Sequence, residues 1–182
     1  MVATQARQAR PWRLSARARK ATLVVHLVSG VGWLGVDAVL LVLSLTAFTS
    51  DDPVTVAACY RAMGFFVVPA LLTAGLLCLG SGVLLGLGTR YGLLRYWWVA
   101  VKLGINVVLT SLVPILLWPR VDEAAALARE NPTGLDTASL GRLPVDLLFP
   151  PLVSGTALIV AIVLAVYKPW GLIRPASRTS GG

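Results

Sequence analysis

Four long apolar runs, separated by polar segments, dominate the pattern of this sequence. They cover residues 21–48, 57–87, 96–118 and 145–166. Each run reaches the roughly 20 helical residues that cross a hydrocarbon core of about 30 Å. None of the runs alternates polar with apolar residues as barrel strands do, and a helix satisfies its own backbone hydrogen bonds in lipid. The pattern therefore predicts an all-α membrane protein in which four transmembrane helices form an antiparallel bundle.

Proline and polar clusters mark the expected boundaries. A turn-forming cluster at 49–53 separates the first two runs, and Pro69 is expected to kink the second helix because proline lacks a backbone N–H. The third run closes with Trp118 and Pro119. Beyond it, residues 122–130 (DEAAALARE) predict a short extracytoplasmic helix with acidic residues at its start. The expected organisation is a basic cytoplasmic tail (1–20), a transmembrane domain (21–168) and a flexible cytoplasmic tail (169–182).

Charge alternates from one polar segment to the next. The loop after the first run carries Asp51 and Asp52, whereas the N-terminal tail has basic residues and no acid. Cytoplasmic segments are enriched in Lys and Arg, so both termini are expected in the cytoplasm. The same tail is expected to attract anionic lipid headgroups. The net charge of +8 does not indicate nucleic-acid binding, because no folded basic domain presents it. The tail's basic residues are Arg7, Arg10, Arg13, Arg17, Arg19 and Lys20.

Composition agrees with a membrane protein. The chain is 57% hydrophobic and 13% charged, about half the charge of an ordinary soluble domain. Its mean hydropathy is +0.79. The first run far exceeds the roughly 7–15 apolar residues of a cleavable signal peptide, so it is interpreted as a membrane anchor. Cys59 and Cys78 lie about 28 Å apart along one predicted helix, so they cannot pair within it and are expected to be structural thiols.

Two ionisable residues inside the first run stand out. His26, the only histidine, and Asp37 are separated by about three helical turns and therefore share one face, together with Gly30 and Trp33. Ionisable groups in hydrocarbon are costly and usually mark a pathway or a site. A rise of about 16 Å separates the two residues, so they are expected to belong to different sites.

The third run supplies two further polar residues, Lys102 and Asn106. Lys102 lies about 9 Å into its helix, shallow enough for its ammonium group to reach the cytoplasmic surface, and His26 has a similar depth. If the first and third spans are neighbours, His26 and Lys102 form one site, and Asp37 with Asn106 forms a deeper polar site. The alternatives are a histidine hydrogen-bonded between helices, an interfacial lysine, a neutral aspartic acid bonding a neighbouring helix, and an asparagine that joins two helices.

Short motifs carry a resemblance to a known family. His26, the Trp33-Leu34-Gly35 segment and Trp98-x-x-x-Lys102 resemble actinobacterial four-helix membrane proteins of unknown function, whose relatives include CopD-type copper-resistance domains and HemJ-type protoporphyrinogen oxidases. The resemblance implies a multi-pass protein of the bacterial cytoplasmic (plasma) membrane. It also implies haem b or porphyrin binding between the first and third helices, with His26 as the iron ligand and Lys102 beside an anionic group. Trp98 stands where the oxidase-like pattern has an arginine.

Three classes of function follow from these residues. The first is a haem- or porphyrin-linked redox protein. The second is a proton or small-solute transport component that uses Asp37 and Asn106. The third is a non-catalytic subunit of a membrane complex, or a homo-oligomer, that packs through its glycine-rich second helix. The sequence has no Ser/His/Asp set, phosphate loop or zinc motif, so it does not support a hydrolase or nucleotide-dependent enzyme. It does not decide whether the protein is an enzyme.

Overall fold

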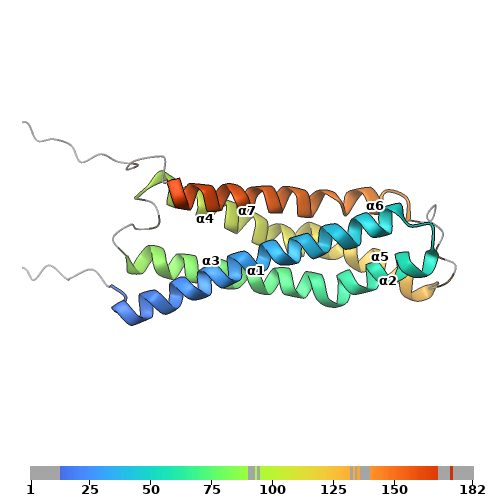
Figure 1. Ribbon diagram of the computed structural model, residues 1–182, viewed down its shortest axis with the longest axis horizontal. Coiled ribbons are helices and arrows are strands. Elements are labelled where there is room, and N and C mark those ends of the chain that lie inside the picture. Colours follow the sequence, from blue (N-terminus) through green and yellow to red (C-terminus); the bar gives the residue numbers. More distant parts are fainter. Residues whose placement is uncertain are drawn as a thin grey trace, which may run out of the picture.

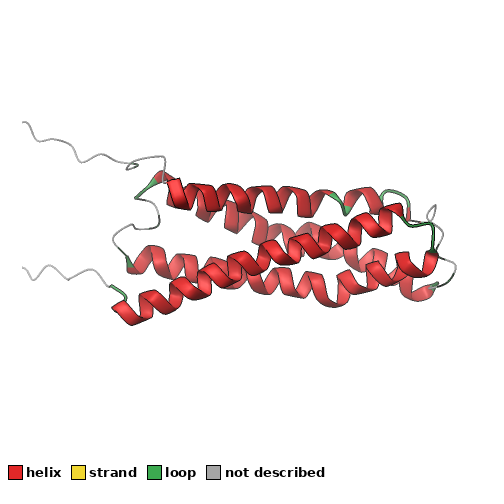
Figure 2. Cartoon of the chain, viewed as in Figure 1, coloured by secondary structure: helices red, strands yellow, loops and turns green. Residues whose placement is uncertain are grey.

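The computed structural model describes residues 13–89, 93, 95–131, 133, 135, 140–167 and 173. Within these residues the regular structure is helical and no strand occurs (Figure 2). Residues 1–12 of the predicted basic tail, and all but one residue of the predicted C-terminal tail, lie outside the described residues. The elements are α1 (Ala16–Thr49), α2 (Pro53–Ala62), the π-helical segment η1 (Met63–Val67), α3 (Val68–Gly88), α4 (Trp97–Leu112), the π-helical segment η2 (Val113–Leu117), α5 (Trp118–Glu130), α6 (Leu143–Asp146) and α7 (Phe149–Tyr167).

Among the residues that the structure describes, four helical stretches are long and apolar enough to cross a membrane, which agrees with the four predicted spans. Large apolar side chains on their outer surfaces are exposed, among them Val28 (67%), Phe65 (88%) and Val166 (70%). Exposed apolar side chains along the full length of a helix are typical of contact with lipid. The expectation of a polytopic membrane protein is thus supported. The stretches are Ala16–Thr49, Pro53–Gly88, Trp97–Glu130 and Leu143–Tyr167.

The long helices lie side by side in a closed ring. Contacts join α1 to α3, α3 to α4, α4 to α7 and α7 back to α1, whereas α1 and α4 lie diagonally across the ring (Figure 1). Backbone hydrogen bonds tie Leu14 N–H to Gly88 O (3.2 Å) and Ile173 N–H to Arg95 O (3.0 Å). The start of α1 and the end of α7 lie at the same end of the ring, and α2 and α5 pack together at the other end. The second span therefore lies between the first and the third.

Each of the two middle spans contains a π turn directly before a proline. Proline has no N–H to donate, so the helix widens by one residue ahead of Pro69 and Pro119, while Val68 and Trp118 keep the right-handed helical conformation. The disturbance predicted at Pro69 thus takes the form of a π turn. The N–H groups involved are those of Val68, which donates to Met63 O, and of Trp118, which donates to Val113 O.

The third span differs from its predicted boundaries. It was expected to end at Trp118 and to be followed by a separate helix over 122–130. Instead, α4, η2 and α5 form one continuous helix from Trp97 to Glu130. Pro119 does not end the helix because the π turn ahead of it, in which Trp118 N–H donates to Val113 O, accommodates the missing N–H. The separate extracytoplasmic helix was therefore a wrong prediction.

The other spans are longer or less regular than the sequence suggested. α1 begins five residues before the predicted start because Ser15 caps it, accepting a hydrogen bond from Ala18 N–H at 3.2 Å. Asp52 caps α2 in the same way. The fourth span is split between α6 and α7 by a turn at residues 147–148, since Pro150 and Pro151 are tolerated only in the first turn of α7.

Candidate functional site

One face of α1 points into the ring of helices and carries the polar residues His26, Ser29, Asp37 and Ser44. The buried residues recur every three or four positions, which is the period of a helix face. His26 is half-buried and lies one helical turn before Ser29, the first buried residue of this face. The structure thus places His26, Trp33 and Asp37 on one face, as their spacing predicts. The buried residues are Ser29, Trp33, Asp37, Leu40, Ser44 and Ala47.

The imidazole of His26 is held by α3. Its Nδ1 lies 3.0 Å from the carbonyl oxygen of Cys78 and 3.1 Å from Oγ of Ser81. Because a carbonyl oxygen only accepts, Nδ1 carries the hydrogen, and Nε2 is the acceptor of the neutral ring. The thiol of Cys78 is 3.7 Å from the same nitrogen. The ring also packs on Gly82, where an added Cβ would lie 3.2 Å from Cε1 of His26.

Cys78 links this histidine to α4. Its thiol interacts with Ser29 on α1 and with Asn106 on α4, and the positive charge of Lys102 acts on both Cys78 and His26. The hydroxyl of Thr110 extends the group by donating to Asn106 Oδ1 at 3.4 Å. These contacts join three helices in the half of the ring that holds the start of α1. We call this group the His26 cluster: His26, Ser29, Cys78, Ser81, Lys102, Asn106 and Thr110.

The composition of the cluster corrects two expectations. A site formed directly between the first and third spans was expected, but these spans are diagonal, and Cys78 of the second span lies between His26 and Asn106. Asn106 was expected to accompany Asp37. It instead contacts Cys78 and Thr110, while Asp37 faces Ser154 on α7.

Asp37 lies at a pocket of about 350 Å³ between α1, α4 and α7. Its side chain is only 3% exposed, and Oδ2 is buried without a hydrogen-bond partner among the described residues. The walls are mostly apolar. At the end of the pocket near α5 and α6, Arg120 and Asp146 line it, with Nη2 and Oδ2 4.0 Å apart. A carboxyl group in the middle of the membrane thus faces a space that leads toward a charged end of the molecule.

Ser154 is the polar side chain that faces the Asp37 carboxyl group. Its hydroxyl donates a hydrogen bond to Pro150 O at 2.8 Å, within its own helix. The neutral acid is the less costly form of a carboxyl group in hydrocarbon.

Trp33 separates the His26 cluster from the Asp37 pocket. It is 1% exposed, lines the pocket, and packs against α3 at Gly75. A Cβ at Gly75 would lie 3.1 Å from the indole ring and 3.0 Å from Oγ1 of Thr110. The absence of a side chain at Gly75 therefore allows α1, α3 and α4 to meet at this level. The indole closes the space between the two polar regions.

Sequence reasoning did not single out Ser29, Ser81 or Ser154. It named Cys78, but only as a structural thiol. A signal was present, because Cys78 and Ser81 are one helical turn apart and so share a face. A single sequence does not show which neighbouring helix that face contacts.

The expected haem at His26 stays a prediction. Nδ1 is bonded to α3, which leaves Nε2 as the nitrogen that could bind iron, while the ring packs on Gly82 and neither the Asp37 pocket nor the pocket between α2 and α5 includes His26. No group of three or more His, Cys, Asp or Glu suited to a metal occurs in the part of the chain that the structure describes. No protein-family model, curated protein or solved structure matches the chain. The resemblance to CopD- and HemJ-type proteins therefore stays a prediction.

Proposed function

We propose that this polytopic membrane protein is a proton-transfer component of its membrane, with Asp37 as the group that carries the proton. The observation that supports the proposal most is the buried Asp37 carboxyl group, with one unpartnered oxygen, beside a pocket in the middle of the membrane. Intramembrane carboxyl groups that face a cavity are typical of proton relays.

The pocket provides one half of the route. A proton enters from the end of the molecule where Arg120 and Asp146 lie and reaches Asp37 through the pocket. The carboxylate form of Asp37 takes up this proton and holds it as the neutral acid beside Ser154. Release of the proton toward Thr110 returns Asp37 to the carboxylate, so that each cycle moves one proton and leaves the protein unchanged.

The His26 cluster provides the other half. Its hydroxyl, amide and imidazole groups extend the polar face of α1 toward the opposite end, and the neutral imidazole accepts a proton at Nε2. Trp33 lies between the halves, so transfer from Asp37 to Thr110 requires the indole to move. We infer that Trp33 acts as the gate between two partial pathways.

The orientation of the helices in the membrane is part of the same proposal. The basic segments before α1 and after α7 favour an antiparallel bundle with both ends in the cytoplasm of a bacterial cell. The His26 cluster then lies on the cytoplasmic side and the Asp37 pocket opens to the outside. Proton movement is therefore expected from the outside inward under a normal membrane potential.

Proton flux into proteoliposomes tests this function. The purified protein is reconstituted with a trapped pH-sensitive dye, and a potassium gradient with valinomycin sets an inside-negative potential. The parent protein should acidify the lumen, and Asp37→Asn should lower the rate to that of protein-free vesicles. Asp51→Asn, which removes a carboxyl group from the loop after α1, is the control and should retain the parent rate. Equal rates for the parent and Asp37→Asn would overturn the proposal.

A further inference from the structure

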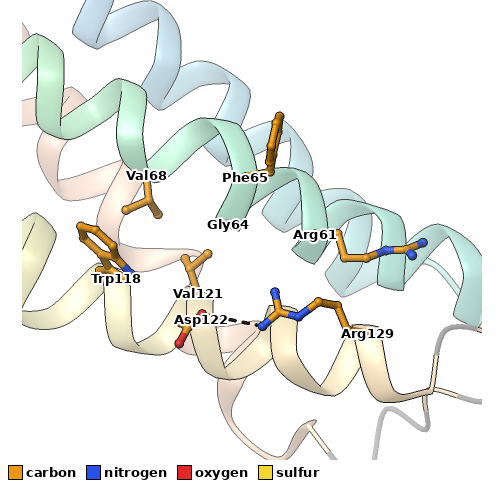
Figure 3. Close-up of a pocket in the computed structure, with 8 residues that line it drawn as sticks. All are labelled: Arg61, Gly64, Phe65, Val68, Trp118, Val121, Asp122 and Arg129. Carbon is orange, nitrogen blue, oxygen red and sulfur yellow. Dashed lines mark ion pairs between the residues drawn. The ribbon is translucent and has the colours of Figure 1, made fainter.

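A second pocket, of about 380 Å³, lies between the two middle spans at the end where α2 and α5 pack together (Figure 3). It is separate from the Asp37 pocket and shares no residue with it. Because Gly64 of the π turn η1 has no side chain, η1 and α5 can approach each other at this pocket. An added Cβ at Gly64 would lie only 3.2 Å from Cβ of Ala125 on α5. The lining residues are Arg61, Gly64, Phe65, Val68, Trp118, Val121, Asp122 and Arg129.

The pocket has a charged end and an apolar end. Arg61 lies in the last turn of α2 and Arg129 in the last turn of α5, whereas Val68 and Trp118, at the starts of α3 and α5, lie deeper toward the middle of the helices (Figure 3). A helical rise of about 16 Å separates Trp118 from Arg129. Phe65 (88% exposed) and Trp118 (47% exposed) present their rings to the surroundings. The pocket thus crosses the boundary between the apolar belt of the helices and their charged end.

The charged end carries more positive than negative charge. Two arginines, Arg61 and Arg129, and one carboxylate, that of Asp122, line this end. Nη2 of Arg129 lies 3.8 Å from Oδ1 of Asp122, and the two side chains are 58% and 68% exposed, so this ion pair contributes little. Arg61 donates Nε–H to Ala57 O at 3.4 Å. A guanidinium group has five N–H donors, so both arginines can still bind a phosphate.

We infer that this pocket binds the headgroup of an anionic phospholipid. Arg61 and Arg129 hold the phosphate, and the acyl chains run along Phe65, Val68 and Trp118. The excess of one positive charge complements a headgroup with a single negative charge. The apolar half of the pocket favours a lipid over free phosphate, because free phosphate would leave that half without an apolar partner. This inference does not depend on proton transfer through Asp37.

Native mass spectrometry of the detergent-purified protein tests the site. The probes are dioleoyl phosphatidylglycerol, the matched phosphatidylethanolamine and phosphatidylcholine, and inorganic phosphate. The parent protein should retain phosphatidylglycerol about tenfold more tightly than the two zwitterionic lipids, and should show no inorganic phosphate adduct at the same concentration. Arg61→Gln/Arg129→Gln should abolish this preference.

Two further variants complete the experiment. Arg142→Gln is the matched control, because it removes an exposed arginine outside the pocket and should keep the preference. Gly64→Leu fills the pocket while leaving both arginines in place, and it should also weaken phosphatidylglycerol binding. The inference is overturned if the parent retains all three lipids equally, if inorganic phosphate binds as tightly as the lipid, or if the double variant behaves like Arg142→Gln.

Discussion

The contact at Gly75 allows a quantitative prediction for the centre of the bundle. A methyl group at this position would lie 3.0 Å from Oγ1 of Thr110 and 3.1 Å from the ring of Trp33. Neither neighbour can move aside easily, since Thr110 is 5% and Trp33 1% exposed. Overpacking of this kind costs about 1–3 kcal/mol. At about 2–4 °C per kcal/mol for a chain of this size, Gly75→Ala should lower Tm by roughly 2–12 °C.

The two native cysteines provide the assay. Cys59 and Cys78 are both free and 6% exposed, so a thiol-reactive fluorophore should label them only as the protein unfolds on heating in detergent. Gly80→Ala is the matched control in the same helix, because an added Cβ there meets nothing within 4 Å. It should leave Tm unchanged or raise it slightly, since alanine favours helix more than glycine does. A Tm for Gly75→Ala equal to or above that of Gly80→Ala would refute the close contact of Trp33, Gly75 and Thr110.

Three further predictions concern single residues. Trp33→Ala should raise proton flux above the parent rate in proteoliposomes, and an unchanged rate would argue against Trp33 as the gate. Hydrogen bonds from the hydroxyl and backbone of Thr55 lower the pKa of Asp52, so its stabilising contribution is present at neutral pH and disappears as the pH falls through that lowered value. Asp52→Ala should therefore lower Tm at neutral pH. The difference from the parent should begin to shrink below the ordinary aspartate pKa of about 3.9 and vanish below the lowered pKa that Asp52 has in the folded protein. The haem prediction rests on the resemblance alone and requires a Soret band in the purified protein that is lost in His26→Ala. A colourless protein that takes up no added haem would contradict the haem prediction.

The helices of this protein could be predicted from sequence because hydrophobicity alone determines them. Runs of apolar residues long enough to cross a membrane can satisfy their backbone in lipid only as helices, and four such helices are present. Their ends were harder to place. Pro119 was expected to stop the third helix, but the π turn before it lets the helix continue to Glu130. The sequence around a proline does not show whether the helix ends there or continues through a π turn.

The polar regions were predictable along one helix but not between helices. The 3.6-residue period was enough to place His26, Trp33 and Asp37 on one face of α1. The partners of these residues depend on which helices are neighbours, and periodicity carries no such information. The ring order places α3 between the first and third spans, which joins Asn106 to Cys78 and leaves Asp37 to Ser154.

Chemical modification of Asp37 tests the central claim most directly. Dicyclohexylcarbodiimide is apolar and enters the membrane, and it reacts with a protonated carboxyl group: the acid proton moves to a carbodiimide nitrogen, the carboxyl oxygen adds to the central carbon, and rearrangement leaves a stable N-acylurea. Mass spectrometry of digested protein should locate this adduct on Asp37 in the parent and find none at that position in Asp37→Asn. An unmodified Asp37, under conditions in which the carboxyl groups at the ends of the helices do react, would contradict a protonated carboxyl group accessible within the membrane.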